Sequence, residues 1–332
     1  MKISVIGAGA FGTAMAISAA RAGNEVVLWA HDPEVARTIA ESGTNPDYLR
    51  GASLGERIVA TNDLAEAARF SDTMFMVVPS HHYREVLGNM QPHLRGGTRV
   101  ISGTKGIEND SLDRMSAISA AVLGGQLSAF AVLSGPTFAI ETASGTPTAA
   151  VIASTDVVFA QELQQVLSSP TFRLYHSEDV VGVELAGSLK NVIAIAAGVL
   201  EGLGLGANTN AALITRGLRE MTRLGIAMGG RLETFAGLAG MGDLVLTCTG
   251  ALSRNRTVGV QLGKGLTLEE ILRDAKFVAE GIKTAKSARQ LAKHHAIEMP
   301  ITTEMHRVLY EGQSPREGIQ RLMTRSLKAE VA

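Results

Sequence analysis

The feature that most constrains the fold is a glycine-rich turn close to the start of the chain. Residues 2–6 (KISVI) predict a short strand, GAGAFG (7–12) follows at once, a helical stretch runs to about residue 22, and residues 25–29 predict the next strand. In a GxGxxG turn the first glycine permits the tight turn, the second admits a pyrophosphate and the third lets helix and strand pack closely. Strand, turn, helix and strand in this order predict a dinucleotide-binding unit, with the phosphates at the helix N-terminus. The alternative is a small-residue turn in another α/β protein.

The end of the second predicted strand does not separate NAD from NADP. A pocket selective for NAD places an acid at this point, and the chain reads Trp29-Ala30-His31-Asp32. The ribose position falls on Ala30 or His31, which leaves Asp32 past it. Since neither position supplies an acid or an arginine, we expect both cofactors to be accepted.

Further strand-like segments alternate with helical ones up to residue 177. They are short and almost wholly apolar, which indicates a sheet that is covered on both faces. They lie at residues 57–61, 73–78, 98–102, 129–133, 148–153 and 172–176. Beyond Ser177 only helical patterns rich in Ala, Leu, Gly and Met follow. We therefore predict an α/β Rossmann-type N-terminal domain with a mostly parallel sheet (residues 1–177), followed by an all-α, substrate-binding C-terminal domain (residues 178–332).

Composition restricts the class of protein. The 332 residues suffice for two domains, and 45% hydrophobic with 19% charged residues is typical of a soluble globular chain. The net charge of −1 argues against electrostatic binding to nucleic acid or membranes, and we expect no apolar segment long enough to span a membrane. One cysteine, Cys248, leaves no internal disulfide and no cysteine metal cluster, which fits a reducing cytoplasm. We expect Cys248 to be a small buried hydrophobic residue.

One long apolar helix is expected at residues 182–203, and it carries a single internal charge. Between Glu184 and Glu201 the only charged residue is Lys190. A lysine is seldom buried without a partner or a function, and the apolar spacing buries most of this helix. Burial would lower the pKa of Lys190 below its usual value of about 10.4, so that it could donate and accept protons near neutral pH. The alternative is that its side chain reaches solvent past small neighbours.

A single acid in the helical half is the natural partner of this lysine. Asp243 is the only charged residue between Glu233 and Arg254. An acid in apolar, glycine-rich sequence needs a cation, and Lys190 is the other isolated charge. Asp243 could instead, or also, cap a helix that begins at Leu244.

Three further segments are candidates for ligand contacts. Ser253-Arg254-Asn255-Arg256 gathers polar donors at a predicted helix start, which suits a phosphate; an ordinary cationic turn is the alternative. Lys105 and the Gly135–Thr137 turn each follow a buried strand, where ligands gather in parallel sheets. For Lys105 the alternative is a solvated loop lysine. No metal-binding motif is present.

These segments resemble the bacterial NAD(P)-dependent glycerol-3-phosphate dehydrogenases, which interconvert dihydroxyacetone phosphate and sn-glycerol 3-phosphate and supply the backbone of phospholipids. The similar segments run in order from end to end of the chain. They are GAGAFGTAMA (7–16), VVLWAHD (26–32), NPDYL (45–49), VVPSH (77–81), TKGIE (104–108), SGPTFA (134–139), LKNVIAIAAG (189–198), ALITRGLREM (212–221), GMGDLVLTCT (240–249), SRNR (253–256) and VAEG (278–281).

The resemblance implies a role for each matching position. Lys190 would be the proton donor and acceptor. Contacts with NAD(P)H, the turn glycines included, would come from Gly9, Ala10, Phe11, Gly12, His31, Lys105, Ala139, Arg254, Val278 and Glu280. Substrate contacts would come from Lys105, Gly135, Thr137, Lys190, Asp243, Ser253, Arg254 and Asn255. Family members often carry Ser at position 10 and Tyr or Trp at position 11, so Ala10 and Phe11 retain only the backbone contacts there. The cofactor would lie in the cleft between the domains, and a cytoplasmic homodimer is expected.

Two other functions compete with this one. One is a dehydrogenase of the β-hydroxyacid or ketopantoate type, which also joins a Rossmann domain to a helical domain. The phosphate-binding SRNR turn and the GMGDLVLTC loop argue against it. The other is a non-catalytic dinucleotide sensor, which would not need Lys190 and Asp243 as isolated charges.

Overall fold

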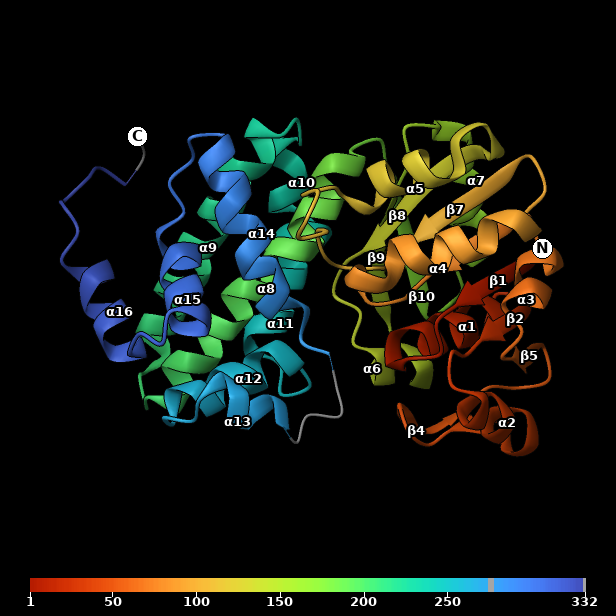
Figure 1. The fold of residues 1–332 in the computed structure, drawn as a ribbon, viewed down its shortest axis with the longest axis horizontal. Helices are drawn as coiled ribbons and strands as arrows, with labels where there is room; N and C mark the ends of the chain where they lie inside the picture. Colours follow the sequence, from red (N-terminus) through yellow and green to blue (C-terminus); the bar gives the residue numbers. More distant parts are fainter. Residues whose placement is uncertain (274–277, 331–332) are drawn as a thin grey trace.

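The strands expected in the first half of the chain form one eight-stranded sheet in a computed structural model that describes residues 1–273 and 278–330 (Figure 1). They are β1 (Lys2–Ile6), β2 (Glu25–Trp29), β5 (Ile58–Thr61), β6 (Thr73–Met76), β7 (Thr98–Ser102), β8 (Leu127–Ser134), β9 (Thr148–Ala153) and β10 (Phe172–Ser177). A second, antiparallel pair of short strands, β3 (Thr44–Asn45) and β4 (Leu49–Ser53), was not predicted.

The strand order places a crevice beside the glycine turn. The order is β10-β9-β8-β7-β6-β1-β2-β5, and β8–β9 is the only antiparallel pair in this sheet. The prediction of a mostly parallel sheet is therefore confirmed. The order changes direction at β1, which lies between β6 and β2. In open α/β sheets the ligand crevice lies at the carboxyl ends of the strands at such a point, which is where the turn after β1 begins.

Helices cover the sheet on both faces. The covering helices and turns are α1 (Ala10–Arg21), α2 (Pro33–Ser42), α3 (Leu64–Phe70), η1 (Ser80–His82), α4 (Tyr83–Met90), η2 (Gln91–His93), α5 (Met115–Leu123), η3 (Gly124–Gln126), α6 (Ala139–Ser144) and α7 (Val157–Leu167). Within β1, Ile3 and Val5 pack in the core formed with α1, α2, α6 and α7, whereas Ile6 packs in the core formed with α3, α4 and α5. The strands are apolar on both sides because both sides are buried.

The described part of the chain after β10 is entirely helical. Its elements are α8 (Val180–Gly202), α9 (Ala207–Ala227), α10 (Leu232–Ala236), a π-helical turn η4 (Leu238–Gly242), α11 (Asp243–Thr249), α12 (Arg254–Gly263), α13 (Leu268–Arg273), α14 (Glu280–His294), α15 (Pro300–Tyr310) and α16 (Pro315–Met323). The helical half lies to one side of the sheet in Figure 1. The boundary expected after residue 177 stays a prediction, although β10 ends at Ser177 and α8 begins at Val180.

Glycines let α8 and α12 approach each other closely. A Cβ atom on Gly198 of α8 would lie 2.0 Å from the backbone oxygen of Arg256, and one on Gly259 of α12 would lie 2.0 Å from the backbone oxygen of Ile195. Because no side chain could occupy either position, the two helices pack backbone to backbone. This packing brings the first turn of α12 beside the middle of α8, where Lys190 lies.

The expectation that no apolar segment reaches the length of a membrane span was wrong for α8. This helix has 23 residues and a mean hydropathy of 1.6, which would suffice by length and composition. However, 94% of its apolar window is buried inside the molecule. Its neighbours are α9, α11, α12, α14 and α15, so its surroundings are those of a core helix.

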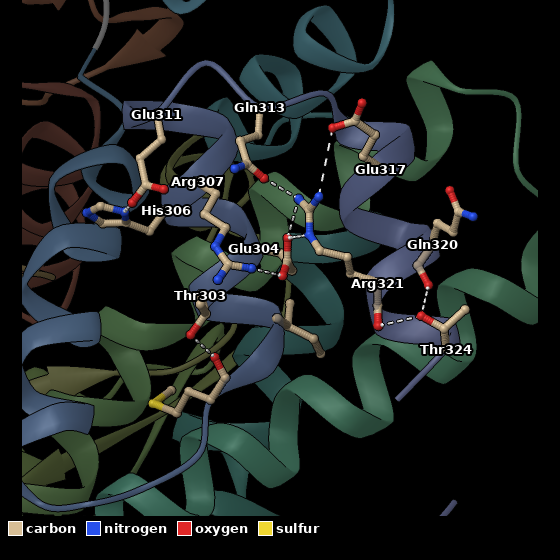
Figure 2. Close-up of polar contacts among 12 residues, drawn as sticks. Thr303, Glu304, His306, Arg307, Glu311, Gln313, Glu317, Gln320, Arg321 and Thr324 are labelled. Atoms are coloured by element: carbon tan, nitrogen blue, oxygen red, sulfur yellow. Dashed lines mark hydrogen bonds and ion pairs between the residues drawn. The ribbon is translucent and has the colours of Figure 1, made fainter. Parts of the chain in front are cut away.

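Helix α16 is bound to α15 through a carboxylate that lies between two arginines (Figure 2). Glu304 of α15 is 8% exposed and accepts hydrogen bonds from Arg307 at 2.6 Å and from Arg321 of α16 at 2.8 Å. Arg321 also donates to Gln313 in the connecting loop. We refer to Glu304, Arg307 and Arg321 as the Glu304 cluster.

Candidate active site

The glycine turn has the geometry that its spacing predicts. Gly7 has φ +118°, and a Cβ atom there would lie 2.6 Å from the backbone oxygen of Val77. A Cβ atom on Gly12 would lie 1.8 Å from the backbone oxygen of Gly7, whereas one on Gly9 would meet no atom within 4 Å. Gly9 also precedes α1 without any side-chain cap. The first turn of α1 therefore presents its N–H groups to open space.

This space is a cavity of about 820 Å³ lined by both halves of the chain. The residues predicted to contact cofactor or substrate line it, with the exception of Gly135. The lining residues among them are Gly9, Ala10, Phe11, Gly12, His31, Lys105, Thr137, Ala139, Lys190, Asp243, Ser253, Arg254, Asn255, Val278 and Glu280. Gly135 has φ +146°, and its Cβ atom would lie 2.9 Å from Cα of Ala150. Backbone packing against β9 thus requires glycine there, independently of any ligand.

A buried carboxylate joins two lysines at the floor of the cleft. Asp243 is 1% exposed, and its Oδ1 accepts a hydrogen bond from Nζ of Lys190 at 2.5 Å. Its Oδ2 accepts one from Nζ of Lys105 at 2.7 Å. Lys190 is 6% exposed, so its side chain does not reach solvent past its small neighbours. The expected proximity of Lys190 and Asp243 is thus observed, and Lys105 is a second cation that the sequence did not pair with them. We refer to these three residues as the Asp243 cluster.

Burial and charge set the protonation of the Asp243 cluster. Burial and the charge of Lys105 lower the pKa of Lys190, Asp243 opposes both, and the net result is a pKa of about 8. Burial alone would raise the pKa of Asp243, but the two lysines outweigh it and hold that pKa below its usual value. The carboxylate is therefore ionised at neutral pH, and Lys190 titrates within the range in which a lysine can donate or accept a proton.

Asp243 does not cap the helix that follows it. Asp243 is the first residue of α11, the N-cap position is Gly242, and no side chain caps this end. Both carboxylate oxygens point instead to the lysines. The alternative of a helix cap, which the sequence left open, is therefore wrong.

The SRNR segment does begin a helix, α12, as predicted. Oγ of Ser253 accepts a hydrogen bond from the backbone N–H of Arg256 at 3.2 Å, so Ser253 is the N-cap. The Asn255 side chain is 9% exposed and donates to Oδ1 of Asn191 at 3.0 Å. Arg254 is exposed and lines the cavity. A helix start with an arginine that is free to approach a ligand is suited to an anion.

Comparisons with known proteins agree over the whole chain. The model of the NAD-dependent glycerol-3-phosphate dehydrogenase N-terminus matches residues 2–160, and that of the C-terminus matches residues 179–320. Glycerol-3-phosphate dehydrogenase [NAD(P)+] of Citrifermentans bemidjiense is 52% identical over 99% of this chain and 98% of its own length. That of Geobacter sulfurreducens is 51% identical over the same shares. The chain belongs to the NAD-dependent glycerol-3-phosphate dehydrogenase family.

Solved structures support the same assignment. Glycerol-3-phosphate dehydrogenase from Coxiella burnetii superposes with a TM-score of 0.93, at 41% identity, over 98% of this chain and 99% of that one. A ketopantoate reductase from Ralstonia eutropha reaches a TM-score of 0.61 at 18% identity. That second likeness shows the fold alone, so the ketopantoate alternative receives no functional support from it.

The residues present fit the dinucleotide of the glycerol-3-phosphate dehydrogenase family. The uncapped start of α1 and the open space over Gly9 suit a pyrophosphate. His31 lines the cavity after β2, and Asp32 lines it too. However, Oδ1 of Asp32 caps α2 by accepting a hydrogen bond from the N–H of Glu34 at 2.9 Å. With one carboxylate oxygen bound in this way, Asp32 is a weaker ribose ligand than a free acid.

Three residues of this dehydrogenase site were missed from the sequence. Oγ1 of Thr247 accepts a hydrogen bond from Nζ of Lys190 at 2.8 Å. Thr247 lies four residues after Asp243 on the same helical face, which is a spacing that could have identified it. Asn191 binds Asn255, as described above, and follows Lys190 directly. Asn45 is fully buried and donates to the backbone oxygen of Ala8 at 2.8 Å, so it supports the glycine turn from the β3–β4 hairpin.

The single cysteine takes no part in the chemistry. Cys248 is 1% exposed, and burial raises its pKa to about 12. The thiol therefore stays protonated near neutral pH and behaves as a small hydrophobic group, as predicted.

Proposed function

We propose that this chain reduces dihydroxyacetone phosphate to sn-glycerol 3-phosphate with NAD(P)H, reversibly, with Lys190 as the proton donor and acceptor. The observation that carries the proposal is the position of the Asp243 cluster. It lies in one cavity with the glycine turn of the first half and the SRNR helix start of the second. Members of the family bear the name of this reaction, and the product is a precursor of glycerophospholipids.

The mechanism follows from the protonation of Lys190. When bound, the reduced nicotinamide supplies the hydride that adds to the C2 carbonyl carbon of the substrate. Lys190, as ammonium, donates a hydrogen bond to the carbonyl oxygen, stabilises the negative charge that grows there, and then protonates it. In the reverse direction the neutral amine accepts that proton. Asp243 holds Lys190 in place and favours its charged form.

The phosphate of the substrate is assigned to the start of α12. Arg254 and Asn255 would bind its oxygens, aided by backbone N–H groups of the first turn. Binding at this remote group orients C2 relative to Lys190, so that binding energy lowers the activation barrier of the reaction. Thr137 lines the cavity and would contact the substrate directly, whereas Gly135 is not among the lining residues and would act by shaping the turn that carries Thr137.

Three further properties are proposed: the range of cofactors, the oligomeric state and the location in the cell. The ribose position carries His31, which is neither the acid that favours NAD nor the arginine that favours NADP, and Asp32 caps α2. Both NADH and NADPH should therefore be accepted. The protein should be a homodimer, which light scattering would test, and should reside in the cytoplasm. Both of the last two properties rest on the family resemblance.

The decisive test is an oxidation assay with NADPH or NADH as the reductant. We expect the oxidation of NADPH or NADH to depend on dihydroxyacetone phosphate, and we expect sn-glycerol 3-phosphate as the product. Turnover with ketopantoate, or NAD(P)+ reduction with 3-hydroxyisobutyrate, in preference to this pair would establish a competing dehydrogenase function. Cofactor binding without any of these reactions would instead support a non-catalytic sensor.

A further inference from the structure

A serine of the first half binds a carboxylate of the second half at the edge of the cleft. Ser80 begins η1, shortly after β6, and Glu280 is the first residue of α14. The backbone N–H of Ser80 donates to Oε1 of Glu280 at 2.9 Å, and Oγ of Ser80 donates to Oε2 at 2.6 Å. Both carboxylate oxygens are thus bound by one residue from the opposite half. Ser80 itself is 2% exposed and is not among the residues that line the cavity.

Further hydrogen bonds connect the start of α14 with residues on the substrate side of the cleft. The residue after Glu280 is Gly281, whose N–H donates to Oδ1 of Asn255 at 2.9 Å. The amide of Asn255 donates in turn to Asn191 at 3.0 Å, and Asn191 is the neighbour of Lys190. A chain of direct contacts therefore runs from Ser80 through the start of α14 to the proposed phosphate site.

Two glycines make room for this chain of contacts. A Cβ atom on Gly106 would lie 2.5 Å from Oγ of Ser80 and 3.0 Å from Oε2 of Glu280. A Cβ atom on Gly281 would lie 2.5 Å from the backbone oxygen of Asn191 and 2.8 Å from Oδ1 of Asn255. Since real Cβ atoms do not approach other atoms so closely, any side chain at either position would displace the contact.

We propose that Ser80 is a positioning residue of this dehydrogenase, which holds Glu280 against the cofactor and ties the start of α14 to the phosphate site. The inference rests on the proposed function, in which Glu280 and Asn255 contact cofactor and substrate. Without the Ser80 hydroxyl, one oxygen of Glu280 loses its donor while the carboxylate remains partly buried. Burial raises the pKa of Glu280, and the bonds from Ser80 oppose that rise. Because a partly buried carboxylate that lacks a donor is unfavourable, Glu280 would turn toward water in the absence of the Ser80 hydroxyl and leave its place in the cleft.

The chain contains a matched control for this contact. Ser116 of α5 donates through its backbone N–H to Oε1 of Glu184 at 2.8 Å and through Oγ to Oε2 at 2.7 Å. Glu184 belongs to α8, so this pair also joins the two halves with the same bidentate geometry from its serine, although Glu184 binds Arg114 as well. Neither residue lines the cavity. A comparison of the two serines therefore separates positioning in the cleft from general attachment of the halves.

The test compares Ser80→Ala, Ser116→Ala, Glu280→Ala and the double variant of Ser80→Ala with Glu280→Ala. The Kd for NADPH is measured by its fluorescence on binding, and KM and kcat are measured with dihydroxyacetone phosphate. We expect Ser80→Ala to raise the Kd for NADPH about tenfold, which is the scale of one hydrogen bond to a charged group. It should also raise KM for the substrate and change kcat less. Ser116→Ala should lower the melting temperature and leave the Kd for NADPH and the KM and kcat for dihydroxyacetone phosphate unchanged.

The double variant decides whether Ser80 acts through Glu280. In the Glu280→Ala background, Ser80→Ala should have almost no further effect, because residues in one network are not additive. An undiminished effect there, a wild-type Kd in Ser80→Ala, or an equal rise in Kd with Ser116→Ala would each overturn the proposal. Because the Kd for NADPH needs no turnover, these results stand even if the wild-type protein fails to reduce dihydroxyacetone phosphate, which would refute the proposed function alone.

Discussion

Two buried carboxylates in this molecule are each held between two cations, and only one of them lies at a candidate active site. In the Asp243 cluster the cations are Lys105 and Lys190. In the Glu304 cluster they are Arg307 and Arg321 (Figure 2). Considered as ion pairs alone, the two clusters are alike. Their cations and their surroundings separate them.

The Asp243 cluster combines features that suit proton transfer. Its members come from three segments far apart in the sequence, and all three line one cavity. A lysine changes its pKa readily when buried, whereas an arginine stays charged. Lys190 accordingly has a pKa of about 8. The arginines of the Glu304 cluster can hold α16 but cannot exchange a proton near neutral pH. A buried ion cluster thus indicates catalysis only when it faces a cavity and contains a group that can titrate.

Lys190→Ala should have the largest effect and tests the catalytic side of this comparison. We expect kcat to fall by about 10²- to 10⁴-fold, which is the usual contribution of a general acid. The Kd for NADPH should change little, because Lys190 lies away from the glycine turn. Single-turnover measurements with dihydroxyacetone phosphate would check this. A folded variant that keeps the wild-type kcat would remove Lys190 from the mechanism.

Arg254→Ala should have the next largest effect. The guanidinium is proposed to bind the substrate phosphate, so we expect KM for dihydroxyacetone phosphate to rise by roughly 10- to 100-fold, the range of charge-assisted hydrogen bonds. Reduction of dihydroxyacetone, which lacks the phosphate, should be impaired much less. Equal losses of kcat/KM for both substrates would show that Arg254 does not bind the phosphate.

Asp243→Asn should act mainly through pH. The amide keeps the shape but loses the charge, so the ammonium of Lys190 loses its counter-ion and still faces Lys105. The pKa of Lys190 should therefore fall below about 8. Reduction requires protonated Lys190, and its rate decreases as pH rises through this pKa. We expect the alkaline limb of the kcat/KM profile to move to lower pH. If the limb stays in place in a folded, active variant, Asp243 does not tune the lysine.

The sequence predicted the pairing of two of the three residues of the Asp243 cluster, namely those whose charges are isolated in the sequence. Lys190 and Asp243 each stand alone in an apolar segment, and a buried charge without a partner is unfavourable enough to make their pairing predictable. Lys105 belongs to a polar loop of the other half, so only the packing of the two halves brings it to Asp243. The same applies to Ser80 and Glu280, which are 200 residues apart.

The parts of the fold that were missed depend on backbone geometry. The alternation of apolar strands and helices predicted the eight-stranded sheet, because burial on both faces leaves a clear pattern. The β3–β4 hairpin was missed, since β3 has two residues and β4 is mostly exposed. Gly135 was assigned to the substrate from its place after a buried strand and from the family resemblance, and this contact stays a prediction; the sequence did not show that its φ of +146° and its packing against Ala150 require a glycine.

Glu304→Gln should have the smallest effect on turnover, and it sharpens the comparison by making the same chemical change as Asp243→Asn. The arginines lose their counter-ion, but both are about one-third exposed (33% and 37% of their side chains) and can be solvated. The loss of stability should therefore be about 1 kcal/mol, because solvent screens what would cost more in a fully buried pair. Urea denaturation would measure this loss, and kcat, KM and the pH profile should match the wild type. A shifted pH profile would show instead that the attachment of α16 influences the cleft, and the two clusters would then be parts of one electrostatic system.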